Sequence, residues 1–97
     1  MHYSIQQTQA FINWRCEIRD LRAKIAIGRR IERASMGNLG DIKTLGEGVS
    51  EMRIDVGVGY RVYFTLRGRN IIILLAGGDK ASQNSDIRRA KKIAKDM

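Results

Sequence analysis

Residues 52–69, MRIDVGVGYRVYFTLRGR, constrain the fold more than any other stretch of the chain. Apolar and polar side chains alternate on both sides of Gly57-Val58-Gly59, and a period of two is typical of strands that bury one face. Glycines between two such runs suit the turn of a hairpin. We therefore predict two antiparallel strands joined at these glycines, with one apolar and one polar face.

The register of the predicted hairpin depends on where its turn is centred. With Val58 at the tip, Arg53 lies opposite Tyr63 and Asp55 lies opposite Arg61. This register keeps the apolar side chains of both strands on one face, as a half-buried sheet requires. The other face is then expected to carry arginines on stiff strands.

Strand and helix patterns flank the hairpin on both sides. Further strands are predicted at residues 2–6, 42–45 and 70–78, and residues 49–56 and 60–66 are the strands of the hairpin itself. Residues 70–78, NIIILLAGG, are apolar on both faces, which indicates a strand covered on both sides. A basic last helix is predicted over residues 83–95, with Ser82 as its N-cap.

The N-terminal part of the chain predicts two helices joined by a break. Thr8 suits the first N-cap, Asp20 suits the N-cap of a second helix, and Gly37 suits the C-terminal cap. One apolar stripe repeats at helical spacing through both helices. Its members are Phe11, Trp14, Ile18, Leu21, Ile25, Ile31 and Ala34.

This order of elements predicts an α+β fold: a twisted antiparallel sheet with an N-terminal helical hairpin and a C-terminal helix. The helices are expected on one face of the sheet, so that the polar face with the arginines is partly open. A length of 97 residues with 43% hydrophobic side chains supports one core, and we expect a single domain over residues 1–97.

The net charge of +8 favours a polyanionic or an acidic protein partner, although solubility alone also accounts for it. Cys16 is the only cysteine, so no disulfide framework forms, which suits a reducing cytoplasm. The apolar run of residues 71–76 is far shorter than the roughly 20 residues of a membrane span, and the N-terminus has no signal-peptide pattern. We expect no membrane partner, metal or cofactor.

Four side chains of the polar face and its surroundings carry the candidate chemistry: Arg53, Arg61, Tyr63 and Lys80. Arginine forks and the lysine ammonium bind phosphate oxygens and stabilise the charge that develops during phosphoryl transfer. Tyr63 is expected to stack on a base. The competing explanation is a set of cross-strand ion pairs, with Asp55 neutralising Arg61 and with Glu51 pairing Lys43 or Arg53.

Three stretches of the sequence resemble a known family. These are residues 37–55 (GNLGDIKTLGEGVSEMRID), 59–64 (GYRVYF) and 74–87 (LLAGGDKASQNSDI). Together they are similar to the RelE/HigB-like toxins of type II toxin–antitoxin modules, in the subgroup called addiction-module killer proteins of the RelE/ParE superfamily. The resemblance extends from about Phe11 to the C-terminus and implies the same fold as the patterns above.

The resemblance implies a toxin that inhibits translation by cleaving mRNA in the ribosomal A site, and therefore an endoribonuclease. It also implies a cognate antitoxin, of the helix-turn-helix HigA-like kind, in a hetero-oligomeric complex. The arginine of GYR, here Arg61, contributes to catalysis in such toxins, and Arg53 and Lys80 match further basic positions. Cations expected to hold RNA through salt-sensitive contacts are Lys43, Arg67, Arg88, Lys91 and Lys92.

The sequence departs from this family at the groups that move protons. Glu51 stands where the best-studied member has a basic residue, Ile87 stands where it has a tyrosine, and His2 is the only histidine. Tyr63, Glu51 and Asp79 remain candidates for proton transfer if their pKa values move toward neutrality. Two alternative functions stay open: a ParE-like toxin that poisons gyrase without cutting RNA, and a degenerate toxin that only binds its antitoxin.

Overall fold

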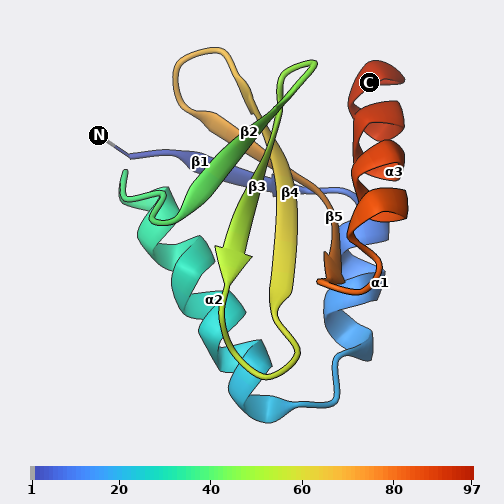
Figure 1. Ribbon diagram of the computed structural model, residues 1–97. Helices are drawn as coiled ribbons and strands as arrows, with labels where there is room; N and C mark the ends of the chain where they lie inside the picture. The colour runs from blue at the N-terminus through green and yellow to red at the C-terminus, as the bar shows by residue number, and fades with distance from the viewer. Residues whose placement is uncertain (1) are drawn as a thin grey trace.

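Residues 2–97 are described by the computed structural model, in which strands and helices follow one another in the predicted order (Figure 1). The elements are β1 (Ser4–Gln7), α1 (Gln9–Glu17), α2 (Leu21–Ser35), β2 (Ile42–Gly46), β3 (Val49–Ile54), β4 (Tyr60–Arg67), β5 (Ile71–Asp79) and α3 (Gln83–Lys95). The α+β class predicted from the sequence is confirmed.

The predicted break between the first two helices is confirmed by their caps. The Thr8 hydroxyl accepts a hydrogen bond from the Phe11 N–H at 3.1 Å, which satisfies a free donor at the start of α1. The Asp20 carboxylate accepts from the N–H groups of Arg22 and Ala23 at the start of α2. Each helix therefore begins at the residue type that local chemistry favours there.

The five strands form one sheet in the order β1-β5-β4-β3-β2. The pairs from β5 to β2 are antiparallel, as predicted, but β1 runs parallel to β5 with Ser4 beside Ile71. The sheet is therefore mixed rather than wholly antiparallel. The apolar strand β5 lies between β1 and β4, and its side chains contribute to cores on both sides of the sheet, which confirms that both of its faces are covered.

The register of the β3–β4 hairpin differs from the prediction by two residues. Arg53 pairs with Arg61 and Ile54 pairs with Tyr60, so the loop is centred on Gly57 and not on Val58. A shift of two residues leaves every side chain on its predicted face, which explains why the alternation of the sequence did not reveal it. The expected pairs of Arg53 with Tyr63 and of Asp55 with Arg61 are wrong.

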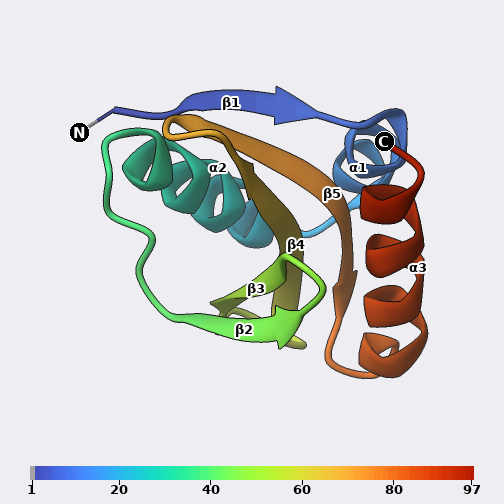
Figure 2. The ribbon, with the colours of Figure 1, turned by 90° about the horizontal axis from the view of Figure 1, so that it is seen from above.

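Helices cover both faces of the sheet, not one as predicted (Figure 2). One core contains Phe11 of α1 and Ile27 of α2, packed on Met52 and Val62 of the sheet. A second core contains Ala90 of α3, packed on β-strand side chains that point the other way. The polar face is therefore not open along its length, because α3 lies across β4 and β5.

The outer surface of α2 also differs from the prediction. Leu21 and Ile25 are 68% and 46% exposed, although both were assigned to the apolar stripe. Arg30 is half-buried and turns toward the sheet. The buried residues of α2 are Ala34, as predicted, together with Ala23 and Ile27, which the predicted stripe did not include.

Candidate functional site

The site begins with a row of three residues across neighbouring strands. Arg53 of β3 pairs with Arg61 of β4, and Arg61 pairs with Gly78 of β5. Lys80 follows at the end of β5, where its N–H donates to the Gly59 carbonyl at 2.8 Å. Gly59 is close to both Lys80 and Arg61. A β-carbon placed on Gly59 would lie 3.7 Å from Lys80 Cβ and 3.8 Å from Arg61 Nη1. The three predicted cations therefore come together at one end of the sheet.

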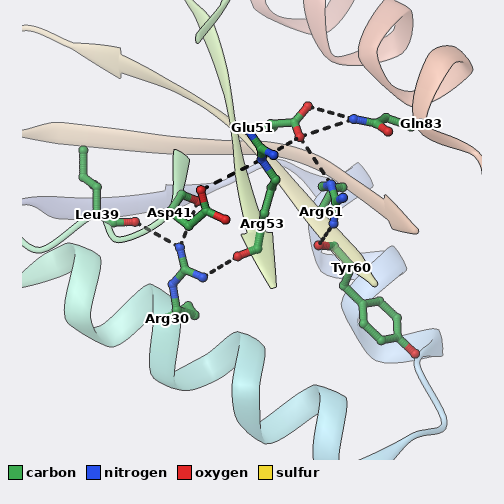
Figure 3. A network of polar contacts seen from close by, with 8 residues as sticks. All are labelled: Arg30, Leu39, Asp41, Glu51, Arg53, Tyr60, Arg61 and Gln83. Atoms are coloured by element: carbon green, nitrogen blue, oxygen red, sulfur yellow. Dashed lines mark hydrogen bonds and ion pairs between the residues drawn. The ribbon is translucent and has the colours of Figure 1, made fainter. Parts of the chain in front are cut away.

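The carboxylate of Glu51 connects the two arginines (Figure 3). Its Oε2 lies 3.3 Å from Arg61 Nε and 3.6 Å from Arg53 Nε. The exposed fractions of the side chains are 1% for Glu51, 9% for Arg61 and 37% for Arg53. The exposed carboxylate of Asp41 also lies 4.0 Å from Arg53 Nε. Two carboxylates, one buried and one exposed, thus balance the two guanidinium groups.

Gln83, the first residue of α3, holds Glu51 from the other side. Its Nε2 donates to Glu51 Oε1 at 3.1 Å and to Oε2 at 3.3 Å. With both oxygens engaged by Gln83 and the arginines, Glu51 is not a free acceptor for a substrate proton. Gly78 allows α3 to lie this close to β5, since a methyl group on Gly78 would overlap the carboxylate of Asp86 in α3.

Arg30 supports Arg53 from the opposite side of the sheet. Its guanidinium donates to the backbone carbonyls of Arg53, Leu39 and Asp41 and so ties α2 to the start of β2 and the end of β3 (Figure 3). Burial lowers the pKa of Arg30, with Arg33 adding to the shift, while the carboxylates of Asp41 and Asp55 oppose it. Arg30 lies one helical turn from Ile27 and one from Ala34, on the buried stripe of α2. This spacing was the signal in the sequence that Arg30 faces the sheet.

Tyr63 does not fulfil the role expected from the sequence. It is fully buried beneath α3, so its ring cannot stack on a base. Burial raises the pKa of its hydroxyl, the nearby carboxylates of Glu51 and Asp86 act in the same direction, and Arg61 opposes them. A phenol with a raised pKa stays protonated near neutrality and is a poor general base.

The five expected RNA-binding cations all occupy the side of the sheet that faces α3. Lys43 lies on β2 beside Glu51, and Arg67 ends β4, about 20 Å from Arg61 at the rise of a strand. Arg88 and Lys92 are exposed on α3, whereas Lys91 is half-buried and pairs with Glu47 at 3.3 Å. Their binding role stays a prediction, and only Lys43 approaches the row of Arg53 and Arg61.

The ion-pair explanation is correct for part of the site. Glu51 pairs with Arg53, as one form of that explanation anticipated. Arg61 pairs with Glu51 rather than with Asp55, because the observed register moves Asp55 away from β4. Lys80 takes part in no ion pair among residues 2–97 and is exposed. Gln83 was missed, since a glutamine at a helix start carries no signal for a contact made in three dimensions.

Comparison with known proteins places this arrangement in a family. Residues 17–97 match the family described as "Phage derived protein Gp49-like". The chain belongs to the Gp49-like family. This family is a toxin-like family of toxin–antitoxin modules. The Gp49-like match includes Glu51, Arg53, Arg61, Lys80 and therefore the whole candidate site.

A curated relative has the same extent. An uncharacterized protein of Haemophilus influenzae (strain KW20 Rd) is 44% identical over 97 residues, which cover 100% of this Gp49-like chain and 98% of the relative. No solved structure matches the chain. Within residues 2–97, no helix has both the length and the apolar character that crossing a membrane requires, and no cluster of metal-ligating side chains occurs.

Proposed function

We propose that this Gp49-like protein is the toxin of a type II toxin–antitoxin module and inhibits translation by cleaving mRNA on the ribosome. The observation that carries the proposal is the convergence of Arg53, Arg61 and Lys80 at one end of the sheet. The family supports the toxin, and the cation cluster supports a phosphate of the RNA backbone as its target.

The three cations differ in how they meet a phosphate. Arg53 is 37% exposed and Lys80 is exposed, so both are able to contact phosphate oxygens directly. Arg61 is 7% exposed as a residue, its Nε faces Glu51, and its Nη1 donates to the Tyr60 carbonyl at 3.1 Å. Arg61 therefore acts mainly as a fixed charge beneath the bound phosphate.

The proposed reaction is attack of an RNA 2′-hydroxyl on the adjacent phosphate, which forms the O2′–P bond, breaks the P–O5′ bond and gives a 2′,3′-cyclic phosphate and a 5′-hydroxyl. Water accepts the 2′-hydroxyl proton and supplies the proton that the leaving 5′ oxygen takes up. Charge builds up on the phosphate oxygens in the transition state, and cations fixed before the reaction stabilise it without reorganisation. Tyr63 and Glu51 are both unsuited to accept the 2′-hydroxyl proton, for the reasons of burial and hydrogen bonding given above. The protein thus contributes charge and position.

Induction in cells followed by mapping of mRNA 5′ ends tests the proposal. New 5′ ends within coding regions are expected for the natural chain. Arg61→Ala is expected to fold, because Arg53 still pairs with the buried Glu51, yet to lose growth arrest. Arg53→Ala and Lys80→Ala are each expected to reduce cleavage, by about tenfold or more for loss of one charge contact. Arg69→Ala, at an exposed position in the β4–β5 turn, is the matched control.

Two results would reject the proposal. The first is unchanged toxicity of Arg61→Ala. The second is growth arrest with intact mRNA and a DNA-damage response, which would identify a gyrase poison.

A second candidate, a protein that only binds its antitoxin, is favoured by one observation. Glu51 already occupies the guanidinium of Arg61 in a buried pair, and a phosphate must compete with it. This candidate predicts no growth arrest on induction of the natural chain, which the same experiment measures.

A further inference from the structure

The outer surface of α2 carries a furrow that the proposed reaction does not use. Three adjoining hollows, of about 280, 350 and 430 Å³, follow the helix from Arg22 to Met36. Arg29 lines all three, and Ala26 and Val56 line two, so the hollows are continuous. In Figure 1, α2 lies beside the loop that joins β3 and β4, which forms the other wall.

The furrow is lined by four arginines against two acidic residues, Glu32 and Asp55, and so combines a net positive charge with exposed apolar side chains. Arg22, Arg29 and Arg33 are exposed and take part in no ion pair among residues 2–97. Ile25 and Met36, between and beyond them, are 46% and 61% exposed. Large parts of Ile25 and Met36 thus stay in contact with solvent, and an apolar patch rimmed by charge is typical of a protein-binding surface.

We propose that this α2 furrow binds an acidic, amphipathic segment of a partner protein. Carboxylates of the segment would meet Arg22, Arg29 and Arg33, and its apolar side chains would cover Ile25 and Val56. The furrow spans about 21 Å at the rise of an α-helix, which a partner helix of about 14 residues matches. The proposed function identifies this partner as the antitoxin, and only that identification rests on the proposed function.

The chemistry of the furrow favours this occupant over two others. A second copy of the chain would bring together two surfaces of a protein with a net charge of +8, and the like charges would repel. Single-stranded RNA is held on aromatic faces as well as on cations, and no aromatic side chain lines the three hollows. Carboxylates with apolar neighbours fit both features.

The furrow lies on the other side of the sheet from the candidate site. Ile54 and Val56, which line it or adjoin it, belong to the core under α1 and α2, whereas Arg61 faces α3. A segment in the furrow therefore leaves Arg53 and Lys80 uncovered. The complex is expected to bind RNA and the acidic segment at the same time.

Fluorescence anisotropy with a synthetic peptide of 18 residues, carrying glutamates and leucines at helical spacing, tests the inference on the full chain. A scrambled peptide of the same composition is the probe control. The charge reversal Arg29→Glu with Arg33→Glu is expected to raise the Kd about tenfold or more, and Ile25→Ser about threefold. The matched control, Arg89→Glu with Lys95→Glu at exposed positions on α3, changes net charge equally and is expected to alter the Kd less than about twofold.

Each remaining outcome overturns the inference. Equal losses in the α2 and α3 reversals would show that net charge alone attracts the peptide, as would equal binding of the scrambled peptide. Loss of binding to a single-stranded RNA oligonucleotide only in the α2 reversal would assign the furrow to RNA. A dimer that the α2 reversal dissociates would assign it to a second copy. Because the assay contains no ribosome, failure of RNA cleavage leaves its result unchanged, and the two proposals fail separately.

Discussion

Arg61 Nε lies 3.3 Å from Glu51 Oε2, and the two side chains are 9% and 1% exposed. A buried ion pair adds little net stability, because desolvation of both charges offsets their attraction. Removal of one partner is costly, however, since the other charge is left in a poorly hydrated place. Glu51 therefore has a structural effect that is separable from any role in binding phosphate.

Glu51→Gln is expected to lower the free energy of unfolding by about 3 kcal/mol, because it leaves Arg61 buried without its carboxylate. Urea denaturation measures this change. Glu47→Gln is the matched control, since Glu47 is 68% exposed in its pair with Lys91, and a change below about 0.5 kcal/mol is expected there. Equal effects of the two substitutions would contradict the argument that burial makes the loss of the Glu51 charge costly.

Lys80→Ala is expected to weaken the binding of single-stranded RNA and to reduce its salt dependence. One lost phosphate contact lowers the slope of log K against log salt by about 0.7. Titrations of a short RNA at several salt concentrations measure the slope, with Arg69→Ala as control. A slope identical to that of the natural chain would remove Lys80 from the phosphate contacts.

Gly77→Ala is expected to destabilise the protein by about 3 kcal/mol or more, since a methyl group on Gly77 would overlap the indole of Trp14. Gly28→Ala is the control. A methyl group on Gly28 meets only the flexible end of Arg15, and alanine favours the helix by about 0.5–1 kcal/mol. Thermal unfolding of both variants separates the packing effect from the change in backbone entropy. The prediction fails if Gly77→Ala unfolds at the same temperature as the natural chain.

Tyr63→Phe tests the buried phenol. The folded state raises the pKa of Tyr63 above its ordinary value of 10.0, so the folded protein holds this proton more tightly than the unfolded chain does. The resulting stability is complete below pH 10 and is lost as the pH rises further, by at most about 1.4 kcal/mol per pH unit.

Stability curves from pH 8 to about pH 11 are therefore expected to fall more steeply for the natural chain than for Tyr63→Phe. The substitution is also expected to keep growth arrest, since the hydroxyl is buried without a hydrogen-bond partner among residues 2–97. Loss of toxicity in a stably folded Tyr63→Phe protein would restore the catalytic role that its burial argues against.

The local elements were predictable because their signals are local. Thr8 and Asp20 cap helices through atoms two or three residues away, and the alternation of β3 and β4 sorts side chains by face whatever their register. The loop around Gly57 was misplaced because a period of two does not distinguish registers that differ by two. The position of α3 was mispredicted because Tyr63 was taken as polar surface, although its ring belongs to a core.

The candidate site was predictable as a set of cations and not as a network. Arg53, Arg61 and Lys80 follow from the strand pattern together with the turn after β5. The carboxylate of Glu51, which balances the arginines, is held in place by Gln83. Gln83 lies 32 positions after Glu51 in the sequence and reaches it only because α3 packs on the sheet. Contacts at such separation have no periodic trace in a sequence.

The parallel pairing of β1 with β5 has a consequence for synthesis of this chain. Ser4 is made 67 positions before Ile71, its neighbour in the sheet, so the first strand has no partner until β5 has been synthesised. The row of Arg53, Arg61 and Gly78 needs the same late strand. A nascent chain thus emerges with its cations unassembled, and they gather only after β5 has left the ribosome.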